Sequence, residues 1–203
     1  TRFELTQIQA KAILDMQLHR LTGLELEGIN KVVTNQKKLQ TRQGTAKTKI
    51  KDLTGYDYLI GSLHYLKMGQ QYVCFDENAG EVQKIIDCYF GGDGEAYMRE
   101  YFRQLADLPK YGKFDFIAHF DLIAKHAEST NLFAYDSDDY LRCATETAEA
   151  LLPHIPFFEV NTGAMSRGYR TTPYPSPRII RMLKEISKKH LIIMVTHNPE
   201  LAE

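Results

Sequence analysis

The chain has 203 residues, of which 43% are hydrophobic and 25% are charged, values that are typical of a globular protein and exclude a disordered chain. At this length we expect one domain with an appendage, whose core needs no disulfide or structural metal to fold. The net charge of −1 excludes a protein that is basic along its whole length. This value is the sum of a basic segment and an acidic remainder. Residues 28–51 contain seven Lys and Arg residues and no carboxylate, which leaves a net charge of −8 for the rest.

Cysteine usage and hydropathy bear on the compartment. Cys74, Cys88 and Cys143 show no metal-binding spacing, and their odd number suits a reducing environment. No apolar run is long enough to span a bilayer, and the N-terminus lacks the pattern of a signal peptide. We therefore expect a soluble, cytoplasmic protein without a membrane partner.

Residues 1–33 are predicted to form a helical segment, because Thr6 and Gln9 fit a capping box and apolar residues follow at helical spacing as far as Gly23. Residues 34–50 are polar and basic and are interpreted as a linker. Their positive charge would also bind phosphates in a salt-dependent way. No aromatic residue stands among them to stack on bases, so nucleic-acid binding through residues 28–51 is kept only as an alternative.

From residue 51 onward, predicted strands and helices alternate. The strands are expected at 58–60, 72–75, 114–118, 157–160 and 191–195, and the helices at 81–89, 95–105, 139–152 and 177–189. Such alternation is typical of parallel strands joined by crossover helices. Residues 51–203 are therefore assigned to one α/β domain.

Three histidines follow predicted strands. His64 follows strand 58–60 after a short turn, His119 directly follows strand 114–118, and His197 follows strand 191–195. Parallel strands bring their carboxyl ends to one edge, so we expect the three imidazoles to converge, with Asp121 two residues beyond His119. Imidazole and carboxylate groups suit zinc, manganese or iron, although a structural role is the alternative for each histidine. The other histidines are interpreted as surface or capping residues: His19, His126, His154 and His190.

A loop with glycine and serine follows strand 157–160 and contains Arg167 and Arg170. A guanidinium group matches the oxygens of a phosphate, and backbone N–H groups beside glycines add further donors. The loop is therefore a candidate phosphate site. The alternative is a structural loop that Arg–carboxylate pairs hold in place.

Four segments together resemble the PHP-type histidinol phosphatases, over about residues 50–189. They are GSLHY at 61–65, IAHFDL at 117–122, FEVNTGA at 158–164 and RGYRTTPYPS at 167–176. The resemblance implies a distorted (β/α) barrel with a multinuclear metal centre. It also implies the hydrolysis of L-histidinol phosphate to histidinol and phosphate, a reaction of histidine biosynthesis.

By this resemblance, His64 and His119 match metal-ligand positions, and Arg167 or Arg170 falls where phosphate would be held. His119 and Asp121 are the candidate catalytic residues, and His197 is the third candidate metal ligand. Nothing upstream of His64 matches the Asp-x-His-x-His strand with which the family's barrel begins. We therefore expect a partial (β/α) barrel of PHP type that follows a helical segment.

The two ends of the chain resemble other proteins. Residues 1–30 are similar to the A subunit of bacterial type II topoisomerases, with the likeness carried from Phe3 through Glu25. Residues 191–203 resemble the switch-histidine strand of ABC-transporter ATPases, without their phosphate-binding loop. This pattern predicts a composite chain.

Three hypotheses about function follow. The first is a metal-dependent hydrolase that acts on a small phosphorylated substrate and is inactive if too many metal ligands are missing. The second is a non-catalytic composite or fragment, whose unpaired strand edges would favour a homo-oligomer. The third is the nucleic-acid-binding module.

Overall fold

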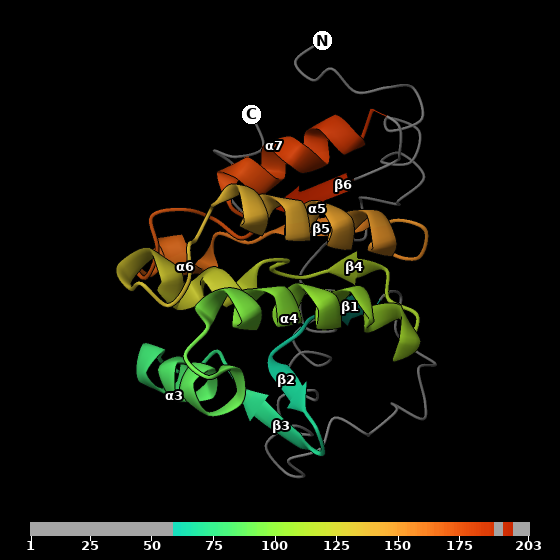
Figure 1. The fold of residues 1–203 in the computed structure, drawn as a ribbon. Helices are drawn as coiled ribbons and strands as arrows, with labels where there is room; N and C mark the ends of the chain where they lie inside the picture. Colours follow the sequence, from blue (N-terminus) through green and yellow to red (C-terminus); the bar gives the residue numbers. More distant parts are fainter. Residues whose placement is uncertain (1–58, 189–192, 197–203) are drawn as a thin grey trace.

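The structure is a computed structural model that describes residues 59–188 and the strand at 193–196 (Figure 1). The helical segment and basic linker predicted within residues 1–50, together with His197, lie outside the described residues. No helix of the described part is both long and apolar enough to cross a bilayer.

Four short strands form a parallel sheet in the order β1–β4–β5–β6. Their bounds are Ile60–Gly61 for β1, Phe116–Ile117 for β4, Phe157–Val160 for β5 and Ile193–Thr196 for β6. Gly61 lies opposite Ile117, which in turn lies opposite Phe158, so β1 and β4 end level with each other and β5 continues for two residues beyond them. The parallel α/β class is confirmed. The described strands form an open sheet and not a closed barrel, so the partial barrel stays a prediction.

The longer α-helices begin at side chains that cap their free N–H groups. The α-helices are α3 (Ala79–Phe90), α4 (Gly94–Ala106), α5 (Asp138–Leu151), α6 (Gly163–Ser166) and α7 (Pro177–Ile186), and the 3₁₀ helices are η2 (Leu108–Lys110) and η3 (Leu122–Ser129). Asn78, Asp93, Ser137 and Ser176 each accept a hydrogen bond from the backbone N–H three residues on. These caps account for helices that begin at or within two residues of the positions that the sequence predicted.

Aromatic side chains fill the space between the sheet and the helices α4, α5 and α7, which lie side by side over one face in Figure 1. Phe102 of α4 is at the centre of this core, with ring centroids 5.2 Å from Tyr140 and 6.0 Å from Phe120. Phe120 in turn contacts Phe158 of β5. Burial of each such ring stabilises the fold by roughly 1.5–3 kcal/mol. The core therefore fixes the segment after β4 against the sheet.

A hairpin outside the parallel sheet corrects one sequence prediction. Strand 72–75 exists as β3 (Gln71–Cys74), but it pairs antiparallel with β2 (Tyr65–Met68), which the sequence analysis missed. Gly69 forms the turn with a φ of +63°, a conformation that glycine adopts without strain. The side chain of Gln104 on α4 bonds both backbone groups of Lys67 and so ties the hairpin to the helical layer. The hairpin therefore brings the residues that follow β3 back beside His64, which directly precedes β2.

Candidate functional site

The carboxyl ends of β1, β4 and β5 bring three polar side chains to one edge of the sheet. His64 lies three residues beyond β1, His119 lies two residues beyond β4, and Glu159 belongs to β5. The imidazole rings of His64 and His119 are edge-to-face, with their centroids 4.9 Å apart. The predicted convergence of these two histidines is present, whereas their role as metal ligands stays a prediction. His197, the third predicted member, lies outside the described residues.

Glu159 links the two neighbouring strands at this edge. Its Oε2 accepts the backbone N–H of His119 at 3.0 Å, and its Oε1 accepts a hydrogen bond from Nδ2 of Asn161, also at 3.0 Å. His119 has a φ of +32°, which residues other than glycine rarely adopt and which is common at functional sites. Glu159 therefore holds a strained backbone in place. The sequence motif contained this glutamate, but the sequence analysis assigned it no role.

Asp76 is a member of the site that the sequence analysis missed. It follows the hairpin, and its Oδ2 lies 2.6 Å from Nδ1 of His64. The hydrogen bond from His64, together with the positive charge of Lys125, holds the pKa of Asp76 well below its usual range. Asp76 is therefore ionised throughout the physiological pH range. No local sequence signal marks it, because only the hairpin brings it to His64.

Asp121 lies in the core and has no exposed surface. Its Oδ2 accepts hydrogen bonds from the Tyr140 hydroxyl and the Ser176 backbone N–H, each at 3.0 Å. Burial raises the pKa of Asp121 to about 6. A carboxylate without exposed surface cannot contact a substrate that arrives from solvent, so these contacts favour a structural role over the catalytic role expected from the sequence.

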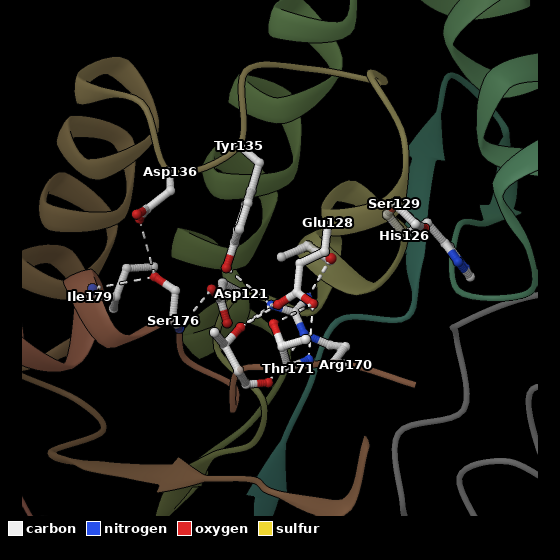
Figure 2. Close-up of polar contacts among 12 residues, drawn as sticks. Asp121, His126, Glu128, Ser129, Tyr135, Asp136, Arg170, Thr171, Ser176 and Ile179 are labelled. Atoms are coloured by element: carbon white, nitrogen blue, oxygen red, sulfur yellow. Dashed lines mark hydrogen bonds and ion pairs between the residues drawn. The ribbon is translucent and has the colours of Figure 1, made fainter. Parts of the chain in front are cut away.

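Arg170 is also buried, with 1% of its side chain exposed. Its guanidinium group forms an ion pair of 2.9 Å with Oε1 of Glu128 (Figure 2). The remaining contacts of this group all lie within the protein: hydrogen bonds to Tyr135, Thr172 and the carbonyl of Ala124, and stacking on the ring of Tyr174 at 4.4 Å. This arrangement favours the alternative that the sequence left open, a loop pinned by an Arg–carboxylate pair.

Arg167, by contrast, is exposed just after α6. Its guanidinium carbon lies 5.9 Å from the ring centroid of Tyr169, and it forms no ion pair with any described residue. Asn161 connects this loop to the sheet edge, because its Oδ1 accepts a hydrogen bond from the N–H of Gly163. The Arg167 side chain lies close to Gly163: a Cβ atom at Gly163 would be 3.3 Å from a guanidinium nitrogen of Arg167. Of the two arginines, Arg167 is therefore the one open to an anion.

The described residues do not complete a metal centre. Among them, no three or more His, Cys, Asp or Glu side chains form a group that could hold a metal ion. His64 and His119 would contribute two imidazoles, but Asp76 bonds to His64 itself and Glu159 bonds to the backbone of His119. This donor set fits only part of the zinc, manganese or iron site expected from the sequence.

Comparison with known proteins defines the class of fold. No protein-family model matches the chain, and no curated protein matches it. Among solved structures, the α/β fold is similar to the crystal structure described as "putative histidinol phosphatase hisK" from Listeria monocytogenes, with a TM-score of 0.53 and 15% sequence identity. The match covers 87% of this chain but 60% of that one. This likeness shows the fold alone. It supports neither of the resemblances predicted for the two ends of the chain.

Proposed function

We propose that this protein is a PHP-type phosphoric monoester hydrolase that acts on a small phosphorylated substrate, with L-histidinol phosphate as the first candidate. One observation carries the proposal: His64 and His119 come from different strands and meet with their ring centroids 4.9 Å apart at the carboxyl edge of a parallel sheet. Carboxylates contact both residues. The similar fold of a protein described as a histidinol phosphatase supports the choice of substrate class.

Each described residue has a task in this proposal. Hydrolysis requires a group that takes a proton from the attacking water and a group that holds the phosphate oxygens. His64 takes the proton on Nε2, and Asp76 stabilises the imidazolium that forms, because its carboxylate already contacts Nδ1. Arg167 binds the phosphate through its exposed guanidinium group. Glu159 fixes the backbone that carries His119.

Dependence on zinc, manganese or iron is part of the proposal, and it comes from the resemblance to the family. A divalent metal would neutralise phosphate charge and activate water. His64 and His119 are the described candidates for its ligands, and His197 is the further candidate predicted from the sequence. A metal bound at Nε2 of His64 would exclude proton transfer at that atom, because Nδ1 is already bonded to Asp76, so the two roles of His64 are alternatives within this proposal. Cytoplasmic histidine biosynthesis is the corresponding biological setting.

A second candidate function is a non-catalytic composite or fragment. The lack of a three-ligand group among residues 59–188 favours it. The two candidates differ in a simple measurement, because only the hydrolase releases phosphate. The nucleic-acid alternative concerns residues 28–51, which lie outside the described part.

Phosphate release from L-histidinol phosphate tests the proposal. The full chain is assayed with no metal and with zinc, manganese or ferrous iron added. We expect release that falls at least about 100-fold in His64→Asn, the order of loss typical of a general acid–base group. A fall of similar order is expected in His119→Asn, because His119 is a candidate metal ligand. His154→Asn is the matched control, because His154 is exposed after α5. If phosphate is released under none of these conditions, the hydrolase is refuted and the non-catalytic protein is favoured.

A further inference from the structure

The contact between His64 and Asp76 is less exposed to solvent than most ion pairs of the described residues. Most of those pairs join exposed side chains on the surfaces of helices, whereas the side chains of His64 and Asp76 are 20% and 22% exposed. The distance of 2.6 Å is shorter than that of an ordinary N–H···O hydrogen bond, as expected when one partner is ionised. The pair also lies beside the ring of His119 and therefore belongs to the candidate site.

Three further contacts fix the position of Asp76. The Cys74 thiol donates to Oδ1 of Asp76 at 3.4 Å, and the ammonium group of Lys125 on η3 donates to the Asp76 backbone carbonyl. One residue earlier, the Phe75 N–H donates to the carbonyl of His64 at 3.5 Å and closes the hairpin. Asp76 is thus held from its own strand, from the opposite end of the hairpin and from a separate helix. A carboxylate held in this way offers its Oδ2 at a fixed point.

An ionised carboxylate can only accept hydrogen bonds, so Nδ1 of His64 must carry the proton of this bond. The lone pair of the neutral ring is then on Nε2. In a protein, the hydrogen bond made by one ring nitrogen decides which nitrogen is free for chemistry. The same relation makes the carboxylate partner of a functional histidine important to activity.

We propose that Asp76 is a positioning residue that fixes the His64 ring in its Nδ1–H tautomer, with Nε2 unprotonated for the chemistry of the site. The role in hydrolysis rests on the proposed function, but the tautomer itself does not. Asp76 acts through His64 and not through direct contact with substrate. Replacement of Asp76 should therefore change the state of the His64 ring as well as the rate.

Nitrogen-15 NMR of the labelled full chain measures the tautomer without any substrate or metal. The two nitrogens of a neutral imidazole ring give distinct signals, because one carries a proton and the other a lone pair. The His64 signals are assigned by their disappearance in His64→Asn. We expect the Nδ1–H pattern in the wild-type protein. An Nε2–H pattern, or an average of the two, would overturn the inference.

Two variants at position 76 separate positioning from mere structural support. Asp76→Asn keeps the size of the side chain but presents an N–H group to the ring, which in His–Asp pairs of other hydrolases produces the wrong tautomer. We expect the Nε2–H pattern in Asp76→Asn and the Nδ1–H pattern in Asp76→Glu, which retains a carboxylate. Asp139→Asn is the matched control, because Asp139 pairs with Arg99 and Arg142 on the surface. An unchanged His64 spectrum in a folded Asp76→Asn protein would refute the inference.

The rate gives a second, separable result. Loss of a carboxylate that orients a functional histidine typically costs about 10–100-fold, so we expect such a fall in kcat/KM for Asp76→Asn and substantial recovery in Asp76→Glu. A wild-type rate in Asp76→Asn, with its tautomer reversed, would refute the positioning role. If the wild-type chain shows the Nδ1–H tautomer but hydrolyses no phosphoester, the proposed function fails while the assignment of the tautomer stands.

Discussion

Replacement of Arg170 by methionine tests whether this arginine is structural. Methionine fills much of the same space but removes the guanidinium group. The carbonyl of Ala124 then loses its partner, and the Glu128 carboxylate, 19% exposed, loses its only cation among the described residues and keeps the hydrogen bonds from Thr171 and Thr172. Breaking a buried ion pair in this way costs about 3–5 kcal/mol. Native domains are stable by only about 5–15 kcal/mol, so the loss is a large share of the total. For a protein of this size it lowers Tm by roughly 6–20 °C.

Urea unfolding followed by circular dichroism measures this loss, with Arg167→Met as the matched variant. Arg167 is exposed and contacts only the ring of Tyr169 among the described aromatic groups, so its replacement should change the free energy of unfolding by less than about 0.5 kcal/mol. In the phosphatase assay, Arg167→Met should raise KM. The reasoning is refuted if Arg170→Met unfolds at the wild-type urea concentration and instead raises KM, because Arg170 would then bind phosphate.

Two further predictions concern the buried carboxylate of Asp121 and the close approach of Gly94 to a neighbouring backbone. Burial raises the pKa of Asp121 to about 6, so the folded state binds more protons than the unfolded state between about pH 4 and 6 and loses stability as pH rises through that range. In Asp121→Asn, the free energy of unfolding should fall by roughly 3 kcal/mol less over this pH range than in the wild-type protein. If the urea midpoints of the wild-type and Asp121→Asn proteins change with pH at the same slope, the raised pKa of Asp121 is contradicted. Gly94→Ala places a Cβ 1.7 Å from the Leu132 carbonyl oxygen and should cost about 1–3 kcal/mol, whereas Gly112→Ala, with 3.5 Å to Phe114, should be near neutral in the same measurement.

Local patterns in the sequence were sufficient for most of the described elements. The strand 157–160 was predicted with the bounds that β5 has, and the helices predicted at 81–89, 95–105, 139–152 and 177–189 correspond to α3, α4, α5 and α7. Strand β2 was missed because Tyr65–Met68 is short and mixed in polarity. It is stable through its pairing with β3 and its contact with Gln104, neither of which has a local sequence signal.

The site could be predicted only where its residues follow strands. His64 and His119 were found because parallel strands end at one edge, a rule that depends on topology alone. Asp76 could not be found, because its approach to His64 requires the turn of the hairpin. The sequence alone does not distinguish the role of Arg167 from that of Arg170. In the structure the two differ in burial, and Arg170 is buried because it contacts the distant residues Glu128 and Tyr174.

The β2–β3 hairpin has a consequence for the lifetime of the site. His64 and Asp76 stand at the two ends of this one small unit, so the pair persists only while the two strands remain paired. Proteins open locally in such units far more often than they unfold as a whole. Hydrogen exchange at the backbone amides of β2 and β3 therefore reports how long the histidine keeps its carboxylate partner, and a change at the exposed turn could tune the site without touching either residue.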